Sequence, residues 1–196
     1  MKVLVACEFS GIVREAFRKR GHDAYSCDII DSDDNSIYHK KMDILYLLKQ
    51  PLKWDLMIAH PPCTYLSNAG ARFLYPKGIL NRDRLCQGLE AAKFFIRLLE
   101  CDIPKICIEN PIPSTAYELP PYTQIIQPYY FGDPYQKKTC LWLKNLPILQ
   151  YSQWRYEKPE STKIAGNWFN KGGKDRQKNR ARTFQGIANA MAEQWG

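Results

Sequence analysis

Residues 2–20, KVLVACEFSGIVREAFRKR, contain the pattern that decides the class of fold. Residues 2–7 form an apolar run with the length of a buried strand, and Ser10-Gly11 interrupts it. Over residues 12–20 the apolar side chains then recur at helical spacing. A strand, a turn of small residues and a helix in this order favour an α/β chain.

The same alternation of strands and helices continues along the chain. Further elements are predicted as strands at residues 23–28, 55–59, 105–109, 125–129 and 138–143, as helices at residues 84–99 and 183–195, and as a short strand or helix at residues 42–48. The polar and aromatic stretch 64–83 reads as a loop, and loops of this length in compact domains are usually functional. We therefore expect a three-layer α/β sandwich with helices on both faces of one sheet.

Composition indicates one globular domain over residues 1–196. The chain is 45% hydrophobic and 24% charged, which excludes a wholly disordered chain. The longest early apolar run, residues 3–7, is too short for a signal sequence or a membrane span. Seven cysteines without a CxxC pair indicate reduced thiols in the cytoplasm, and three unclustered histidines argue against a zinc site.

Positive charge is concentrated near the C-terminus of the chain. The net charge of +8 favours polyanionic partners such as nucleic acid. Residues 171–182, KGGKDRQKNRAR, hold six basic residues and one acidic residue and so supply five of these eight charges. We expect a basic loop or arm at about residues 160–182, either as a solvated loop or as a phosphate-contacting arm. The side chains that would contact phosphates are Lys174, Arg176, Lys178 and Arg180.

Two polar stretches follow the first two predicted strands, at the sheet edge where open α/β sheets bind ligands. At residues 7–11, CEFSG, small residues would let a ligand approach the backbone, and the N-terminus of the next helix favours anionic groups. Asp28 ends the second strand, where an acidic side chain can accept hydrogen bonds from ribose hydroxyls. Either feature alone is also an ordinary cap of a turn or helix.

Two later strand ends carry reactive side chains. Residues 61–63, PPC, open the long loop, and a thiolate of Cys63 would be a strong nucleophile. Three other cysteines lie inside apolar runs and read as buried thiols: Cys7, Cys27 and Cys107. Residues 109–111, ENP, end another strand, and the Glu109 carboxyl group there could be held protonated and act as an acid.

These motifs, in this order, resemble those of the cytosine-5 DNA methyltransferases. Residues 62–70, PCTYLSNAG, match the PCQxFSxAG motif of the family at Pro, Cys, Ser, Ala and Gly, and residues 109–111 resemble its ENV motif. Residues 9–11, FSG, resemble its FxGxG turn, and residues 131–139, FGDPYQKKT, its YGxPQxRxR stretch. Residues 187–191, IANAM, are similar to its C-terminal GNAV, so the resemblance covers most of the chain.

The resemblance implies a Rossmann-like, S-adenosylmethionine-dependent methyltransferase fold and methylation of C5 of cytosine in DNA. It implies Cys63 as the covalent nucleophile, Glu109 as the acid and Lys137 as the cation that contacts the base. The residues that it implies for S-adenosylmethionine binding are Phe9, Ser10, Gly11, Asp28, Asp43, Pro61 and Asn189. It further implies a cytoplasmic protein of a bacterial or phage-infected cell, with DNA as its partner.

Several positions differ from the family pattern. Thr64 replaces the Gln after the nucleophile, Pro111 replaces the Val of ENV, and neither Arg of QxRxR is present. Residues 140–186 are a short stretch where family members carry a large target-recognition domain, so that a separate subunit would have to supply sequence recognition.

These differences leave other functions open. The same chemistry on a free cytosine nucleotide would need no recognition domain, and a catalytically weak relative would serve as an accessory protein that binds cofactor or DNA. An amino-methyltransferase is disfavoured, although its [DNS]PP[YFW] motif resembles HPPC at residues 60–63. Cys63 stands where that class has an aromatic ring that stacks on the flipped base.

The basic stretch generates a prediction about DNA binding. Each phosphate contact contributes roughly 0.7–0.9 to the slope of log affinity against log salt concentration. We therefore expect this slope to become shallower by up to about 3 when four side chains are neutralised together: Lys174, Arg176, Lys178 and Arg180. Affinity should fall equally for all sequences, since phosphate contacts position the protein without reading bases. Fluorescence anisotropy across a salt series measures both quantities. Superimposable curves for wild type and variant would show a solvated loop.

Overall fold

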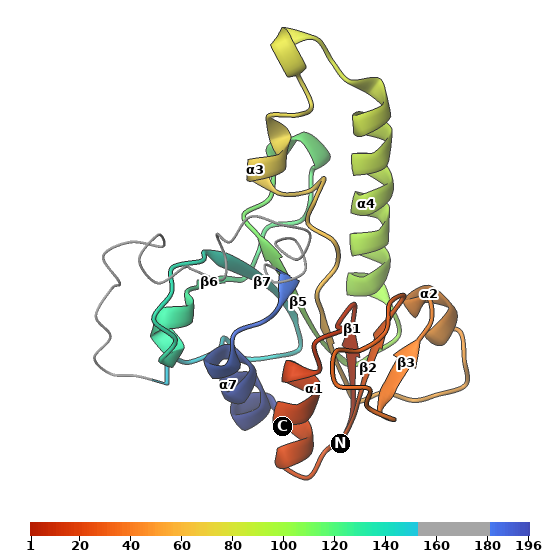
Figure 1. Ribbon diagram of the computed structural model, residues 1–196, viewed down its shortest axis with the longest axis vertical. Coiled ribbons are helices and arrows are strands. Elements are labelled where there is room, and N and C mark those ends of the chain that lie inside the picture. The colour runs from red at the N-terminus through yellow and green to blue at the C-terminus, as the bar shows by residue number, and fades with distance from the viewer. Residues whose placement is uncertain (153–180) are drawn as a thin grey trace.

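The computed structural model describes residues 1–152 and 181–196, which form one sheet with helices on both faces (Figure 1). The strands are β1 (Lys2–Ala6), β2 (Asp23–Asp28), β3 (His39–Lys41), β4 (Leu56–Ala59), β5 (Lys105–Pro111), β6 (Gln124–Ile126) and β7 (Thr139–Lys144). Their order in the sheet is β3-β2-β1-β4-β5-β7-β6. The first five strands follow the order of the doubly wound nucleotide-binding folds. The predicted Rossmann-like, three-layer α/β fold is therefore confirmed.

Five neighbouring strands run parallel, and β7 alone is antiparallel to the strands beside it. In the centre of the sheet Ala6 pairs with Ala59 of β4, which pairs in turn with Ile108 of β5. Beyond these positions β1 and β4 end at one edge of the sheet, where parallel sheets bind ligands, whereas β5 continues to Pro111.

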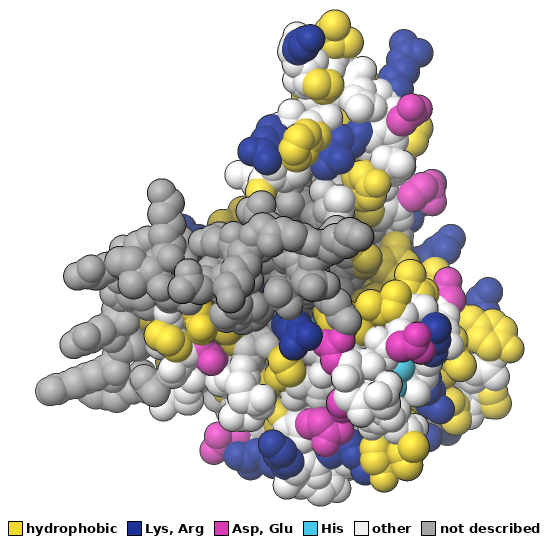
Figure 2. Space-filling model, in the orientation of Figure 1, with side chains coloured by type: hydrophobic (Ala, Val, Ile, Leu, Met, Phe, Trp, Pro, Cys, Tyr) yellow, Lys and Arg dark blue, Asp and Glu magenta, His cyan; other side chains and the backbone are white. Residues whose placement is uncertain are grey.

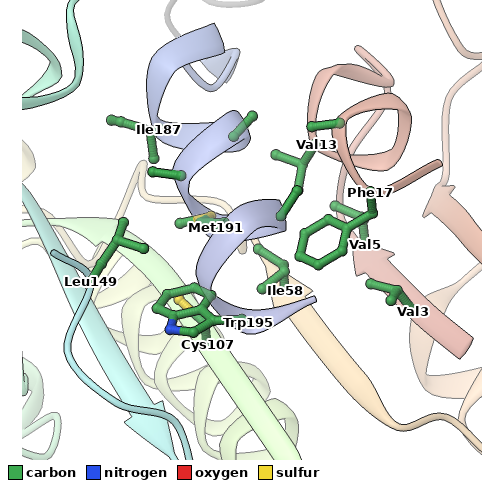
Figure 3. Packing of buried hydrophobic residues seen from close by; sticks show 14 of the residues in the cluster. Val3, Val5, Val13, Phe17, Ile58, Cys107, Leu149, Ile187, Met191 and Trp195 are labelled. Atoms are coloured by element: carbon green, nitrogen blue, oxygen red, sulfur yellow. The ribbon is translucent and has the colours of Figure 1, made fainter. Parts of the chain in front are cut away.

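Helices cover the two faces of the sheet because successive strand residues point to opposite sides. On one face α1 (Ile12–Lys19) and α7 (Gln185–Trp195) pack together. Figure 3 shows Phe17 of α1 and Met191 and Trp195 of α7 around strand residues such as Ile58. On the other face α2 (Ile44–Leu47) and α4 (Arg82–Glu100) bury apolar side chains against the sheet.

Most predicted elements are found with shifts at their ends that have local causes. Of the strand predicted at residues 125–129, only residues 125 and 126 belong to β6, and residues 128 and 129 begin the 3-10 turn η3 (Pro128–Phe131). Helix α4 begins at Arg82, earlier than predicted, because Asn81 caps it by accepting a hydrogen bond of 3.0 Å from the backbone N–H of Arg84. Strand β5 continues through Asn110 and Pro111, where a break was predicted, because β7 pairs with both residues. Residues 42–48 contain helix α2, and the polar edge strand β3 has no apolar pattern to predict it.

The long stretch 64–83 is partly ordered, contrary to the prediction of a plain loop. It contains α3 (Asn68–Ala71) and the 3-10 turn η1 (Pro76–Gly78), and it stands away from the sheet beside α4 (Figure 1). Two further 3-10 turns, η2 (Thr115–Tyr117) and η3 (Pro128–Phe131), lie on the chain between β5 and β7.

Most of the basic stretch predicted at residues 160–182 lies outside the part of the chain that the structure describes. Four candidate phosphate contacts fall there: Lys174, Arg176, Lys178 and Arg180. Among the helices of the described ranges, none has the length and apolar character of a membrane span.

Gly88 of α4 leads to a stability prediction. A Cβ atom at this position would lie 2.1 Å from Cζ of the buried Tyr117 ring, so we expect Gly88→Ala to destabilise the protein by about 1–3 kcal/mol through overpacking. In a Tyr117→Ala background the same change should stabilise by up to about 1 kcal/mol, because alanine favours helices more than glycine does. Denaturant unfolding of the four proteins measures this sign reversal, and a loss of equal size in both backgrounds would contradict it.

Candidate active site

The ends of three adjacent strands bring a histidine and two acids to one edge of the sheet. Glu8 follows β1, His60 follows β4, and Glu109 is the fifth residue of β5. The β ladder continues into this edge, because the backbone N–H of His60 donates to Ala6 O at 2.9 Å. Glu8 and Glu109 are buried, and the side chain of His60 is only 10% exposed.

His60 and Glu109 form a buried ion pair. Nδ1 of His60 lies 3.1 Å from Oε2 of Glu109, and the hydroxyl of Thr183 donates to the same oxygen at 3.4 Å. Thr183 Oγ1 also lies 3.5 Å from Nδ1 of His60. Thr183 precedes α7, so residues far apart in the sequence close this group from the opposite side.

The ionisation of this pair differs from the sequence-based prediction. Burial opposes the charge on Glu109, but the hydrogen bond and charge of His60, with help from Lys137, hold the pKa of Glu109 below its ordinary value. Burial likewise opposes the charge on His60, but Glu109 and then Glu8 raise its pKa. The lowered pKa favours the carboxylate form of Glu109 in the protein without substrate, whereas the sequence predicted a carboxyl group held protonated.

Glu8 occupies the N-terminus of α1. Its carboxylate accepts hydrogen bonds from the backbone N–H groups of Val13 at 2.7 Å and Arg14 at 3.3 Å. Burial raises the pKa of Glu8, against the lowering effect of His60 and of these two N–H groups. The helix N-terminus predicted to attract an anionic group of a ligand is thus already bound by a side chain of the protein.

The FSG turn is shaped by a buried arginine. Gly11 has a left-handed backbone (φ 72°), and a Cβ there would lie 2.3 Å from Nη2 of Arg14. The fully buried guanidinium of Arg14 donates to Ser26 at 2.8 Å and pairs with Asp34. The close approach of the Arg14 side chain therefore explains why residue 11 is a glycine, and no bound ligand is needed for this explanation. Ser10 lies 3.4 Å from Glu8, and the buried Phe9 accepts a hydrogen bond from the backbone N–H of Asp33.

Asp28 and Asp43 differ in how far their carboxylates are engaged. Asp28 ends β2 as predicted, is half-buried, and accepts hydrogen bonds from the backbone N–H groups of Ile30, at 3.3 Å, and of Ile29. Burial raises the pKa of Asp28. Asp43 is the N-cap of α2 and accepts from the backbone N–H of Leu45 at 2.7 Å, which gives it a structural role. Asp28 is therefore the better placed of the two for a ligand hydroxyl.

Cys63 is held at the same edge by contacts of its neighbours. The side-chain amide of Asn110 donates to the carbonyl of the buried Pro61 at 2.9 Å, which ties the end of β4 to β5. The carbonyl of Cys63 accepts from the backbone N–H of Ser67 at 3.0 Å. Arg84 of α4 then donates to Thr64 O at 3.0 Å.

The thiols separate into two groups. Cys63 is half-exposed. Burial raises the pKa of five other thiols: Cys7, Cys27, Cys101, Cys107 and Cys140. Of the three that the sequence predicted as buried, Cys27 and Cys107 are buried and Cys7 is half-exposed. In the case of Cys27 the value reaches about 12. Such thiols stay protonated at neutral pH, and a protonated thiol is not a nucleophile.

A cavity of about 460 Å³ lies between the start of α1 and the chain leading into α7. It is lined by Ile12, Asp133, Tyr135, Arg182, Thr183, Phe184 and Gln185. Asn189, the predicted cofactor contact of α7, is exposed and accepts a hydrogen bond of 2.9 Å from the side chain of Gln185. Gln185 lines this cavity, and Asn189 is not among its lining residues.

Lys137 lies near the buried pair, as expected for a cation at the site. Its charge acts on both Glu109 and His60, and its Nζ lies 5.7 Å from the centre of the Phe184 ring. Its backbone N–H donates to Oε1 of Gln127 at 2.8 Å, which fixes the chain just before β7.

Sequence reasoning missed four residues of this region: Glu8, Arg14, His60 and Thr183. His60 carried a usable signal, because it is the residue that follows β4 directly and a histidine in such a place is a candidate for proton transfer. Arg14 and Thr183 carried none, since only the packing of α1 and α7 shows where they lie.

Comparison with known proteins gives matches in structure alone. No family model and no curated protein sequence matches the chain. One similar solved structure is described as a candidate DNA modification methyltransferase encoded within a prophage of E. coli, with 14% identity, a TM-score of 0.46, and coverage of 73% of this chain and 46% of that chain. Another is a mutant of DNMT2 from Spodoptera frugiperda, with 18% identity, a TM-score of 0.40, and coverage of 82% and 56%. The chain thus spans about half the length of each structure.

The buried pair predicts a window of pH in which it stabilises the fold. Because the pKa of His60 is raised in the folded state, the stabilisation that His60 contributes to the free energy of unfolding is complete below its ordinary pKa of 6.5. This stabilisation is lost as the pH rises through the folded-state pKa. Because the pKa of Glu109 is lowered in the folded state, the stabilisation that Glu109 contributes is complete above its ordinary pKa of 4.5. This stabilisation is lost as the pH falls through the folded-state pKa. The difference in unfolding free energy between wild type and Glu109→Gln should therefore be greatest between pH 4.5 and 6.5.

Denaturant unfolding at pH 3.5, about 5.5 and about 8.5, chosen around these ordinary values, measures this difference. Glu90→Gln is the matched control, because Glu90 pairs with Lys93 on the surface of α4. A difference for Glu109→Gln that does not change with pH would rule out a charged pair.

Proposed function

We propose that the chain is an S-adenosylmethionine-dependent cytosine-5 methyltransferase that acts on DNA through a covalent adduct with Cys63. One observation supports the proposal: β4 and β5 are parallel neighbours, so the segment that carries the half-exposed Cys63 follows β4 at the edge of the sheet where the carboxylate of Glu109 is buried. Asn110 fastens the two strand ends to each other through Pro61. The motif resemblance assigns the nucleophile and the proton-transfer group to these same two positions.

The residues of this edge can perform the chemistry. C5 of cytosine is a poor nucleophile until another group adds to the ring. The Cys63 thiolate adds to C6 while Glu109, in its protonated form, gives its proton to N3, so that Glu109 becomes a carboxylate and electron density moves to C5. After the methyl group is attached to C5, the C5 proton passes to water, the C6–S bond breaks, and Cys63 leaves as a thiolate.

S-adenosylmethionine, when bound, supplies the methyl group. Asp28 is the residue of this chain best placed for its ribose, because it ends β2 at the ligand-binding edge and has engaged only part of its hydrogen-bonding capacity. The cavity beside the start of α1 offers further room at the same edge. Its lining by Tyr135 and Phe184 would exclude water from one side of the site.

A polyanionic substrate fits the charge of the protein. Basic and apolar side chains lie together at the surface of the end of segment 64–83, beside α4 (Figure 2). Phe73, Tyr75 and Ile79 of this segment are at least half exposed, and Arg72 lies over the Phe73 ring at 4.6 Å. Exposed rings together with cations are the features with which proteins hold unstacked bases and phosphates.

A free cytosine nucleotide is the second candidate substrate. Residues 140–186 are short where the family has a recognition domain, and a nucleotide would need none. Labelled S-adenosylmethionine should therefore be offered with duplex DNA, single-stranded DNA and cytosine nucleotides in parallel. Digestion and identification of the methylated nucleoside tests the proposal, which requires 5-methylcytosine. A product labelled on a nitrogen, or no product at all, would overturn it.

Removal of the nucleophile gives the first prediction about activity. We expect Cys63→Ala to abolish methyl transfer while S-adenosylmethionine still binds, because the cofactor contacts come from other strand ends. Cys86→Ala is the matched control, since Cys86 is an exposed thiol on α4 outside the site. Methyl transfer and calorimetric binding are measured on both variants. Turnover by Cys63→Ala would disprove the covalent mechanism.

The second prediction concerns the ribose contact. We expect Asp28→Ala to weaken S-adenosylmethionine binding by about 1.5–3 kcal/mol, the usual loss for a hydrogen bond to a charged group. Asp31→Ala serves as its control, because Asp31 is exposed and pairs with Lys41 at the surface. Isothermal calorimetry gives both dissociation constants. Equal constants for wild type and Asp28→Ala would place the ribose elsewhere.

A further inference from the structure

His60 is the unexplained member of the site. The motif resemblance assigns it no role, yet it is a buried base in direct contact with the proposed acid. Its ring lies at the junction of the strand ends of β1, β4 and β5. A buried histidine that carries charge is costly unless other groups compensate it. The surroundings of the ring therefore show what state it is kept in.

The groups around His60 favour its protonated form. Two carboxylates act on it, Glu109 by direct contact and Glu8 through its charge. On the other side, Lys137 is the positive group that acts against its charge. The charged and polar groups that face it from the surrounding elements are Glu8, Asp28, Glu109, Lys137 and Thr183. Glu109 and Glu8 together raise the pKa of His60 against the effects of burial and of Lys137, which favours a proton on the imidazole.

The contact between His60 and Glu109 shows which ring nitrogen of His60 can exchange a proton with the carboxylate. The contacts of His60 and Thr183 both fall on Oε2 of Glu109. Nε2 of His60 is buried and has no hydrogen-bond partner among the described residues. The proton that can leave the ring toward Glu109 is therefore the one on Nδ1, along the contact of 3.1 Å.

We infer that His60 stores the proton that Glu109 passes to N3 of the cytosine ring, an inference that rests on the proposed cytosine-5 reaction. The N–H bond at Nδ1 breaks as an O–H bond forms on Glu109, and that O–H bond breaks as N3 takes the proton. The electron pair that Cys63 brings to C6 balances the positive charge at N3. His60 ends neutral and Glu109 ends as a carboxylate.

The return of the proton closes the cycle. Once the C6–S bond has broken, the methylated base is still protonated at N3, and it gives this proton back through Glu109 to Nδ1 of His60. The pair is then in its starting state and Cys63 is again a thiolate. In this proposal His60 contacts Glu109, and Glu109 lies between His60 and the base. His60 is therefore a positioning residue, which acts on the base only through the proton that it gives to Glu109.

The stored proton can be observed without any reaction. The chain has three histidines, so the imidazole ¹⁵N signals of the whole protein can be assigned by single substitutions. At neutral pH we expect both ring nitrogens of His60 to be protonated in wild type. In Glu109→Gln the ring should be neutral at the same pH, because burial then acts without the neighbouring charge. A neutral His60 in wild type overturns the inference.

The pH dependence of methyl transfer tests delivery of the proton. His60→Asn keeps an N–H donor near the position of Nδ1 but cannot titrate. Its kcat/KM should fall by about 10²-fold at neutral and alkaline pH, the lower end of the range for proton-transfer catalysis. The loss should shrink toward acid pH, where Glu109 binds a proton directly. His22→Asn, outside the site beside the chain N-terminus, is the matched control and should match wild type at every pH.

The outcomes separate this inference from the proposed function. A constant ratio of wild type to His60→Asn across the pH range shows a merely structural role and overturns the inference. Cytosine methylation by a wild type with neutral His60 overturns the inference and leaves the proposed function standing. A wild type that holds the His60 proton but methylates no cytosine substrate overturns the proposed function, and the delivery step with it.

Discussion

Parallel pairing of β1, β4 and β5 is the constraint on which the candidate site depends. The register joins Ala6 to Ala59 and Ala59 to Ile108, so the residues just beyond these positions lie side by side. His60 and Glu109 are brought into contact in this way although they lie far apart in the sequence. A parallel sheet also needs crossovers on its faces, and α1 and α4 are the helices that provide them.

Buried charge is balanced within this edge of the molecule. Glu8 is compensated by the N-terminus of α1, Arg14 by Asp34 and Glu15, and Glu109 by His60. Each buried ion loses several kcal/mol of hydration, which only close partners of opposite charge offset. A change at one of these groups therefore alters the ionisation of the next. This coupling is what makes a histidine next to the acid chemically significant.

The position of Cys63 depends on contacts made by its neighbours. Asn110 donates to Pro61, two residues before Cys63, and Arg84 donates to Thr64 and Gly70 after it. The guanidinium of Arg84 also lies 5.0 Å from the Tyr65 ring and 5.1 Å from the Phe73 ring. Helix α4 is thus both a cover of the sheet and the support of the segment that carries the proposed nucleophile. Rigid support of this kind keeps a reactive group in position without enclosing it.

The sequence by itself determined the class of fold, because apolar runs and helical spacing are local patterns that survive in most of the observed elements. It also marked Asp28, Cys63 and Glu109, since each stands at a strand end. Only the tertiary structure decided that His60 lowers the pKa of Glu109, that Glu8 caps α1, and that Gln185 lines the cavity beside the start of α7. The physical reason is that ionisation and contact depend on neighbours supplied by other strands and helices, and no local pattern encodes which neighbours those are.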